Sequence, residues 1–301
     1  MTFLITGATG RTSAGVVRHL RAADEDVRVL VRDRPKAQKA FADLGGVEVV
    51  EGAFDDEAVL AQAFDGVDTA FLAVGSSPDQ IRLEQALIDG AVRAELPHLV
   101  KLSSVGTGLD SPLLVGRLHA EIEAHLVASG LPHTLLRPAS FADNLLMTAE
   151  SVATRNSWTG AAPTGRVAYI DIRDLSEATA LVLREPTLQG GIHDWTGPDA
   201  YTFPEVAELL SRILGRTVSY LAASEAERRS SLTALGVPEW FVELRVSLET
   251  GAESGRIGTV NNSLEQLLGR EPRTVQELLT ENAARFGAQS CGPVPSGRAR
   301  H

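Results

Sequence analysis

The first twelve residues restrict the fold most narrowly, because a glycine-rich turn directly follows a short apolar run. Residues 3–5 are Phe, Leu and Ile, which predict a short buried strand. Gly7 and Gly10 allow a tight turn at its carboxyl end, and the apolar residues between 16 and 20 indicate a helix after it. This order directs unpaired amide N–H groups at a phosphate. The sequence therefore predicts a dinucleotide site at Gly7, Thr9, Gly10, Arg11 and Thr12.

The glycine spacing is weak when taken alone. The third small position of the turn is Ser13 rather than glycine, and similar strings occur in ordinary turns. A second apolar strand at 27–31, one strand-helix-strand unit later, strengthens the interpretation. An ordinary strand-to-helix turn without a ligand is the alternative.

Strand and helix patterns alternate as far as about residue 138. Continuous apolar strands that alternate with helices are typical of a parallel sheet covered on both faces. We therefore predict an α/β fold with a Rossmann-type doubly wound parallel sheet. Asp55 is expected as a helix N-cap and Pro78 in the first turn of a helix. The predicted strands are 3–6, 27–31, 47–50, 67–74, 98–103 and 133–138, with helices at 12–23, 35–44, 55–65, 78–94 and 116–129.

Beyond residue 138 the alternation ends and a smaller, mostly helical C-terminal lobe is predicted. The expected domains are a dinucleotide-binding domain at 1–154 and the lobe at 155–287, in which segments near 166–198 return to the main sheet. Residues 288–301 have few apolar side chains and are expected to be disordered. The predicted elements are a helix at 144–154, a Gly/Pro loop, a strand at 167–172, a helix capped by Asp174, a strand at 192–196 and helices at 204–214, 223–235, 238–251 and 274–286.

Composition and charge restrict the class of partner. The net charge of −11 disfavours binding to nucleic acid or to an anionic membrane. No stretch approaches the roughly 18 to 20 apolar residues of a spanning helix. We expect no signal peptide, because the predicted first strand begins at residue 3. The single cysteine, Cys291, cannot form an internal disulfide, and the seven histidines show no metal-ligand spacing. We expect a cytoplasmic monomer or homodimer that acts on a small molecule without a metal.

Arg32 follows the strand at 27–31, where NAD-selective proteins of this fold place an acid on the ribose 2′-hydroxyl. Its planar guanidinium matches a 2′-phosphate, and further positive charge follows in the sequence. The side chain of Asp33 should point elsewhere, because neighbours on an extended backbone face opposite sides. The residues indicate NADPH, with a solvated charged turn as the alternative. At the ends of the third and fourth strands, Phe54, Val74 and Gly75 are expected to contact the adenine and the nicotinamide ribose, although plain strand ends explain them equally.

Ten short motifs follow one another along the chain in a specific order, although each motif taken singly is weak evidence. They are 6–10 (TGATG), 30–33 (LVRD), 66–71 (GVDTAF), 102–104 (LSS), 119–123 (HAEIE), 128–131 (ASGL), 136–141 (LRPASF), 144–146 (NLL), 169–174 (YIDIRD) and 268–272 (LGREP). In this order the sequence resembles the NmrA-like family of atypical short-chain dehydrogenases/reductases. It is similar to the branch that includes NADPH-dependent quinone reductases and triphenylmethane reductases. The resemblance covers residues 1 to about 287 and implies an oxidoreductase that uses NADPH.

The sequence departs from typical short-chain dehydrogenases, which use a tyrosine and a lysine four residues later to protonate the substrate and to hold the ribose. Alignment on Glu123 and the turn at 129–130 places Val115 at the tyrosine position and His119 at the lysine position. His119 is a candidate to bond the ribose or to protonate a substrate, since its unperturbed pKa is near neutral. A helix-surface histidine without a role is the alternative. Ser104 matches the serine that orients a carbonyl, or it simply caps the strand. Cofactor contacts are also expected at Ser103, Ala139 and Phe141.

The missing acid affects which acceptors are suitable. Hydride addition to a ketone leaves an alkoxide with a pKa of roughly 15.7, whereas addition to a quinone leaves a phenol-like anion with a pKa of about 10. The difference of about 6 units corresponds to roughly 8 kcal/mol, at about 1.36 kcal/mol per unit. We therefore expect an NADPH-dependent reductase of quinone-like or other conjugated acceptors, with the proton from His119 or water. A regulator that senses NADP(H) without turnover, and a tailoring enzyme for one specialised metabolite, are the alternatives.

Two further groups of residues have more than one interpretation. A paired-carboxylate site for acid/base catalysis is one interpretation of Asp171, Arg173 and Asp174. The alternative is structural: Asp174 caps a helix, and the other charges belong to a solvated strand end. Four large side chains either line a substrate cleft between the lobes or belong to the core: Trp158, Phe141, Met147 and Trp195.

Overall fold

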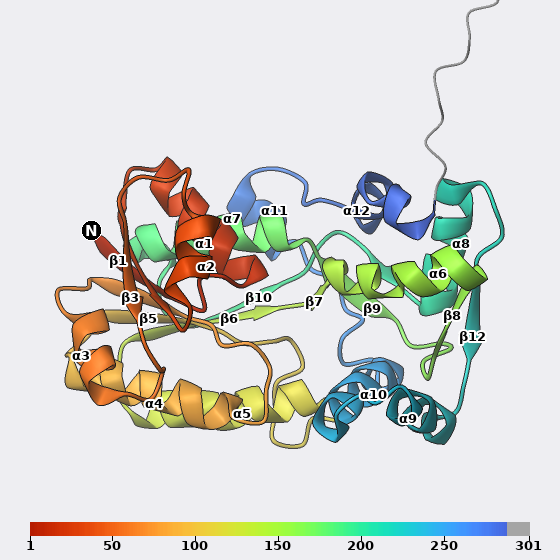
Figure 1. Cartoon of the computed structure of the whole chain (residues 1–301), viewed down its shortest axis with the longest axis horizontal. Helices are drawn as coiled ribbons and strands as arrows, with labels where there is room; N and C mark the ends of the chain where they lie inside the picture. The colour runs from red at the N-terminus through yellow and green to blue at the C-terminus, as the bar shows by residue number, and fades with distance from the viewer. Residues whose placement is uncertain (288–301) are drawn as a thin grey trace, which may run out of the picture.

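The computed structural model describes residues 1–287, and a seven-stranded sheet forms its centre (Figure 1). Every neighbouring pair in this sheet is parallel. The chain order reverses between β1 and β4, which is where ligands bind in sheets of this type. The predicted Rossmann-type doubly wound sheet is confirmed. In spatial order its strands are β10 (Ile192–Trp195), β6 (His133–Pro138), β5 (His98–Leu102), β4 (Thr69–Leu72), β1 (Thr2–Thr6), β2 (Asp26–Val31) and β3 (Val47–Glu51).

Helices cover both faces of the sheet, because successive side chains of a strand point to opposite sides. Phe3 and Ile5 of β1 share an apolar core with one helical layer, and Leu4 shares another core with the opposite layer. Figure 1 shows the two layers on either side of the strands. The continuous apolar runs in the sequence are thus buried on both faces. The first layer contains α1 (Arg11–Ala22), α2 (Arg34–Ala40) and α7 (Ile172–Arg184), and the second contains α3 (Glu57–Phe64), α4 (Gln80–Arg93) and α5 (Leu114–Ala128).

The C-terminal part of the chain forms a smaller lobe at one end of the sheet, on the right in Figure 1, with its own apolar core. Its helices are η1 (Ala142–Thr148), α6 (Ala149–Arg155), α8 (Phe203–Leu214), α9 (Glu225–Ala234), α10 (Glu239–Glu253), α12 (Val275–Glu281) and η3 (Ala283–Phe286). One small sheet contains β7 (Ser140–Phe141), β9 (Val167–Ile170) and β11 (Ala200–Tyr201), and another pairs β8 (Ser157–Gly160) with β12 (Ser219–Ala222). The short helices η2 (Pro186–Leu188) and α11 (Ser263–Leu268) lie beside the main sheet's α7 and β10. Of the segments near 166–198, β10 joins the main sheet, whereas β9 does not.

Three predicted helix starts are wrong, because a neighbouring residue supplies the cap or the first turn. Asp56, not Asp55, caps α3, and its Oδ1 accepts the N–H groups of two residues in the first turn at 2.9 and 3.1 Å. Asp171, not Asp174, caps α7. Pro78 precedes α4, which begins at Gln80. The helix predicted at 144–154 is divided into η1 and α6, and β8 occupies part of the expected Gly/Pro loop.

Two absences apply to residues 1–287. None of their helices has the length and apolarity needed to span a membrane. Nor do three or more His, Cys, Asp or Glu side chains of this part of the chain gather as metal ligands would. The predicted disordered segment at 288–301, which includes Cys291, lies outside the described residues.

Candidate functional site

The glycine turn lies where β1 and β4 separate, at the carboxyl edge of the sheet. Gly7 has a φ of +57°, and a Cβ there would lie 2.4 Å from the carbonyl oxygen of Ala73, so the close approach of the two strands requires glycine. Thr6 adds a bond across the same junction, since its Oγ1 accepts the Ala73 N–H at 2.9 Å. Helix α1 follows with Gly10 as its N-cap, without a side-chain cap or an acid in the first turn. Its N–H groups and positive end therefore remain available for an anion.

A cleft of about 460 Å³ begins at this turn and continues along the carboxyl edge of the sheet. Val115, at the expected tyrosine position, lines it with an apolar side chain. Three predicted cofactor residues, Thr9, Arg32 and Phe54, are not part of its lining. The predicted site residues that do line it are Gly7, Gly10, Arg11, Thr12, Val74, Gly75, Ser103, Ser104, His119, Ala139 and Phe141.

Arg32 lies on the surface at the end of β2. Strand β2 is the neighbour of β1, whose end carries the glycine turn of the cleft. Its guanidinium carbon is 5.9 Å from the centre of the Phe54 ring, which is buried in the core beneath it. Phe54 therefore supports Arg32 from below. The side chain of Asp33 caps α2, and Arg34 pairs with Glu51 at 3.4 Å. Within residues 1–287, the side chain of Arg32 makes no hydrogen bond or ion pair and contacts the Phe54 ring, so its charge is available to a ligand.

His119 is buried between α5 and β5, with 7% of its surface exposed, so the surface-histidine alternative is wrong. Its Nδ1 lies 3.0 Å from Nζ of Lys101, a fully buried lysine of β5 that sequence reasoning missed. Lys101 also donates to the carbonyl of Leu102 at 2.9 Å and lies 3.1 Å from Oε2 of Glu84 on α4. Gln80 donates to Oε1 of Glu84 at 2.9 Å. A buried ion pair thus lies directly behind His119.

Burial beside Lys101 determines the protonation state and the hydrogen bonding of His119. Burial, with the added effect of the Lys101 charge, lowers the pKa of His119 well below its usual value, so the ring is neutral at pH 7. Nδ1 faces an ammonium donor and must accept, which leaves the proton on Nε2. Nε2 has no partner among residues 1–287, and the ring lines the cleft. His119 therefore offers the cleft a hydrogen-bond donor. A pKa lowered in this way disfavours His119 as the source of a proton, which stays a prediction.

The two serines at the end of β5 differ in their engagement. Ser103 donates to Glu123 at 2.5 Å, and Arg137 holds the same carboxylate through bonds of 3.0 and 2.5 Å. Ser104 has a long contact of 3.4 Å from its Oγ to Oγ1 of Thr107, which donates to the Ser104 carbonyl at 2.7 Å. The hydroxyl of Ser103 is therefore used to join α5 to the sheet, whereas the hydroxyl of Ser104 can still bind a ligand.

A second cavity, which we call the lobe pocket, adjoins the cleft. It has a volume of about 510 Å³ and is enclosed mainly by η1, α6, β8, β9 and α10. Met147 lines both cavities, Phe141 lines the cleft and Trp158 lines the lobe pocket. Trp195, the last residue of β10, is buried in the core and lines neither cavity. Six residues line both cavities and connect them: Ser140, Asn144, Met147, Arg245, Leu248 and Ile257.

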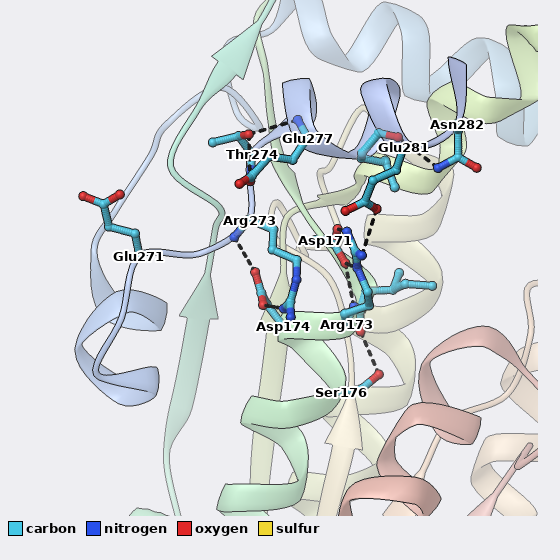
Figure 2. Close-up of polar contacts among 12 residues, drawn as sticks. Asp171, Arg173, Asp174, Ser176, Glu271, Arg273, Thr274, Glu277, Glu281 and Asn282 are labelled. Carbon is cyan, nitrogen blue, oxygen red and sulfur yellow. Dashed lines mark hydrogen bonds and ion pairs between the residues drawn. The ribbon is translucent and has the colours of Figure 1, made fainter. Parts of the chain in front are cut away.

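The paired carboxylates Asp171 and Asp174 are buried, so the expected solvated strand end is wrong. Asp174 accepts the backbone N–H of Arg273 at 2.6 Å and pairs with the guanidinium of the same residue. Asp171 binds Arg173, which reaches Glu281 of α12 at 2.9 Å (Figure 2). These contacts fasten the C-terminal segment to α7, which gives both carboxylates a structural role.

Comparison with known proteins covers nearly the whole chain. Residues 1–279 match the model of the NmrA-like family. The chain is 32% identical to the NAD(P)H azoreductase of Xenophilus azovorans over 285 residues, which cover 95% of this chain and 99% of the azoreductase. Its structure is similar to that of the NADPH-dependent quinone oxidoreductase of Escherichia coli complexed with NADPH, with a TM-score of 0.86, 27% identity and coverage of 93% and 99%. It is also similar to the Citrobacter sp. triphenylmethane reductase complexed with NADP(H), with a TM-score of 0.83, 25% identity and the same coverage.

Proposed function

Because the chain belongs to the NmrA-like family, we propose that it is an NADPH-dependent reductase that transfers hydride to a quinone-like or other conjugated small molecule. The observation that carries the proposal is the continuity of the site. The cleft runs from the uncapped start of α1 past His119 and opens into the lobe pocket. An extended cofactor, with its diphosphate at the helix and its reactive ring near the pocket, fits this arrangement. Azo compounds, quinones and triphenylmethane dyes, to which the names of the three relatives refer, are all conjugated.

The residues present fit NADPH at both ends. The Gly7–Thr12 turn would hold the diphosphate through the N–H groups of α1, which have no side-chain cap. Arg32 would pair with the 2′-phosphate, the group that separates NADPH from NADH. When bound, NADPH supplies the hydride. The Nε2–H group of His119 would donate a hydrogen bond to the nicotinamide ribose, while Val74, Gly75, Ala139 and Phe141 form the walls of the cleft.

The proton would come from water. Val115 is apolar, and His119 is neutral with Nδ1 already occupied by Lys101. Reduction of a quinone leaves a phenol-like anion with a pKa of about 10, which water can protonate without a dedicated acid. The Ser104 hydroxyl would orient the acceptor oxygen at the end of β5. This chemistry is why we propose conjugated acceptors rather than simple ketones.

We propose further that the protein works in the cytoplasm on small molecules, as a monomer or homodimer, and binds neither nucleic acid nor membrane. The net charge of −11 supports the choice of partner, since nucleic acids and anionic membranes attract basic surfaces. The single cysteine suits a reducing compartment.

Purified protein mixed with NADPH and a panel of quinones and azo dyes tests the function. We expect acceptor-dependent loss of NADPH absorbance, slower loss with NADH, and none with cyclohexanone, which serves as the ketone control. Tight binding of NADPH without consumption by any acceptor would contradict the proposal. Reduction of cyclohexanone as fast as that of the quinones would contradict the argument about the missing acid.

A further inference from the structure

We propose that the lobe pocket binds the anionic group of a conjugated acceptor, a carboxylate or sulfonate on its ring system, through Arg245 and Tyr169. The proposal rests on the proposed function for the identity of the ligand as an acceptor. The binding site itself does not depend on turnover, so the two can be tested separately.

Arg245 of α10 carries a charge that its protein neighbours do not satisfy. Its side chain is 22% exposed and lines both the cleft and the lobe pocket. The nearest oxygen of Glu249 is 3.6 Å away, too far for a good hydrogen bond. Glu249 is instead held by Arg228 through contacts of 2.9 to 3.2 Å and accepts the N–H of Ala161 at 2.9 Å. Within residues 1–287, the side chain of Arg245 has one hydrogen-bond contact, from its Nη1 to the sulfur of Met147 at 3.7 Å.

Tyr169 of β9 supplies a second unsatisfied group in the same pocket. Its side chain is 4% exposed, it lines the pocket, and its hydroxyl has no hydrogen-bond partner within residues 1–287. Burial raises the pKa of the phenol, and the charge of Arg245 opposes this rise. The hydroxyl is therefore protonated at neutral pH and can donate. A buried donor without a partner is unfavourable unless a ligand accepts its hydrogen.

The charge of the pocket favours an anion. Arg228 and Arg245 against Glu249 leave one uncompensated positive charge, while Glu150 and Arg155 on the exposed rim cancel. This excess occurs in a chain whose net charge is −11. A neutral carbonyl would accept a hydrogen bond from Arg245 without compensating its charge, whereas an anionic oxygen would do both.

The shape of the pocket suits a ring system attached to that anion. Its volume of about 510 Å³ falls within the roughly 300 to 1,000 Å³ of sites for small organic ligands. Three aromatic side chains form one wall: Tyr220 stacks on Phe203 with ring centres 5.6 Å apart and meets the edge of Trp158 at 5.7 Å. Arg245 lies where the pocket joins the cleft, so a bound molecule can extend its conjugated part into the cleft.

Calorimetric titration of the NADP⁺-saturated protein with 2-naphthoate and 2-naphthamide tests the site. The two probes share a ring system and differ in charge. We expect 2-naphthoate to bind at least about tenfold more tightly, the factor that one charge-assisted hydrogen bond provides. Arg245→Met should abolish this preference, Arg245→Lys should retain part of it, and Tyr169→Phe should weaken 2-naphthoate binding. Arg166→Met is the control, because Arg166 lies outside both cavities and pairs with Glu205.

Equal affinity for the two probes, persistence of the preference in Arg245→Met, or no binding of 2-naphthoate would each overturn the proposal. NADP⁺ affinity, measured for every variant, checks that the fold persists. If Arg245→Met does not fold, 2-naphthoate binding by Arg245→Lys and Tyr169→Phe tests the site instead, and wild-type affinity in both would overturn the proposal. Binding of 2-naphthoate through Arg245 in a protein that consumes no NADPH would leave this site standing and refute the proposed function.

Discussion

Replacement of Lys101 by methionine should destabilise the protein strongly. Methionine has a similar length but removes the ammonium group that lies 3.1 Å from Glu84, where both side chains are at most 1% exposed. Removal of one member of a buried ion pair costs about 3–5 kcal/mol, a large part of the roughly 5–15 kcal/mol that stabilises a typical protein. The variant should therefore unfold at a much lower urea concentration at neutral pH.

The loss should depend on pH, because Glu84 can take up a proton. Burial raises the pKa of Glu84, and Lys101 opposes the rise. Since the folded state then holds the proton more tightly than the unfolded chain, this stabilisation is fully present below the unfolded value of 4.5 and is lost as the pH rises through the folded pKa. Without Lys101 the folded pKa rises further. The deficit should be smaller at acidic pH, where Glu84 is protonated in the variant, and larger at basic pH, where its charge is buried without a partner.

Urea unfolding followed by circular dichroism at acidic and at mildly basic pH measures this effect. The double variant Lys101→Met with Glu84→Gln should recover most of the loss at basic pH, because a glutamine at this position carries no charge and can still accept from Gln80. Lys39→Met, at an exposed position, is the matched control. A Lys101→Met protein as stable as wild type at basic pH, or a double variant no more stable than the single one, would refute the reasoning.

The same substitution should also alter His119. Lys101 requires Nδ1 of His119 to accept, so ¹⁵N NMR of the wild-type protein should show a neutral ring protonated on Nε2 that does not titrate between about pH 6 and 8, because its pKa is lowered. Lys101→Met should admit the second tautomer. Titration of the wild-type His119 signal near its ordinary pKa would contradict the arrangement.

Three further predictions concern the turn, the cofactor's phosphate and the junction of the C-terminal segment. Arg32→Ala should reduce the preference for NADPH over NADH by about ten- to a hundredfold, since a hydrogen bond to a charged group contributes about 1.5–3 kcal/mol; an unchanged ratio of Kd values, with Arg34→Ala as control, would exclude Arg32. Gly7→Ala should lower both Tm and NADPH affinity, because its Cβ would meet the Ala73 carbonyl at 2.4 Å; wild-type values for both would contradict the tight turn. Asp174→Asn should lower the calorimetric Tm by removing the charge buried against Arg270 and Arg273, and a shift no larger than that of exposed Asp55→Asn would argue against its structural role.

The main sheet and the glycine turn were predictable because their signals are local. Strand β1 is buried on both faces, so its sequence is a continuous apolar run. The turn after it requires glycine at position 7, and a Cβ at position 10 would lie only 3.0 Å from the Gly7 carbonyl oxygen. The position of Arg32 after β2 follows from the same regularity. Each of these features depends on neighbours in the sequence.

The rest depends on contacts between distant segments. The residues of β8 have the local pattern of a loop. They form a strand because they pair with β12, which lies far along the chain. Lys101 interrupts an apolar strand, which was a usable signal, but its partners Glu84 and His119 come from two different helices. Burial of Asp174 could not be foreseen, because Arg273 reaches it from the far end of the chain.

A single-turnover experiment measures whether the bound cofactor reacts with a conjugated acceptor. Protein with bound NADPH is mixed with excess 1,4-naphthoquinone, and the cofactor's absorbance is followed with unlabelled NADPH and with NADPH carrying deuterium on either face of its nicotinamide ring. We expect the cleft to hold the cofactor in one orientation, so the bound NADPH should be oxidised completely and one of the two labelled forms should react more slowly. Bound NADPH that stays intact, or rates that are identical for both labelled forms and the unlabelled one, would contradict it.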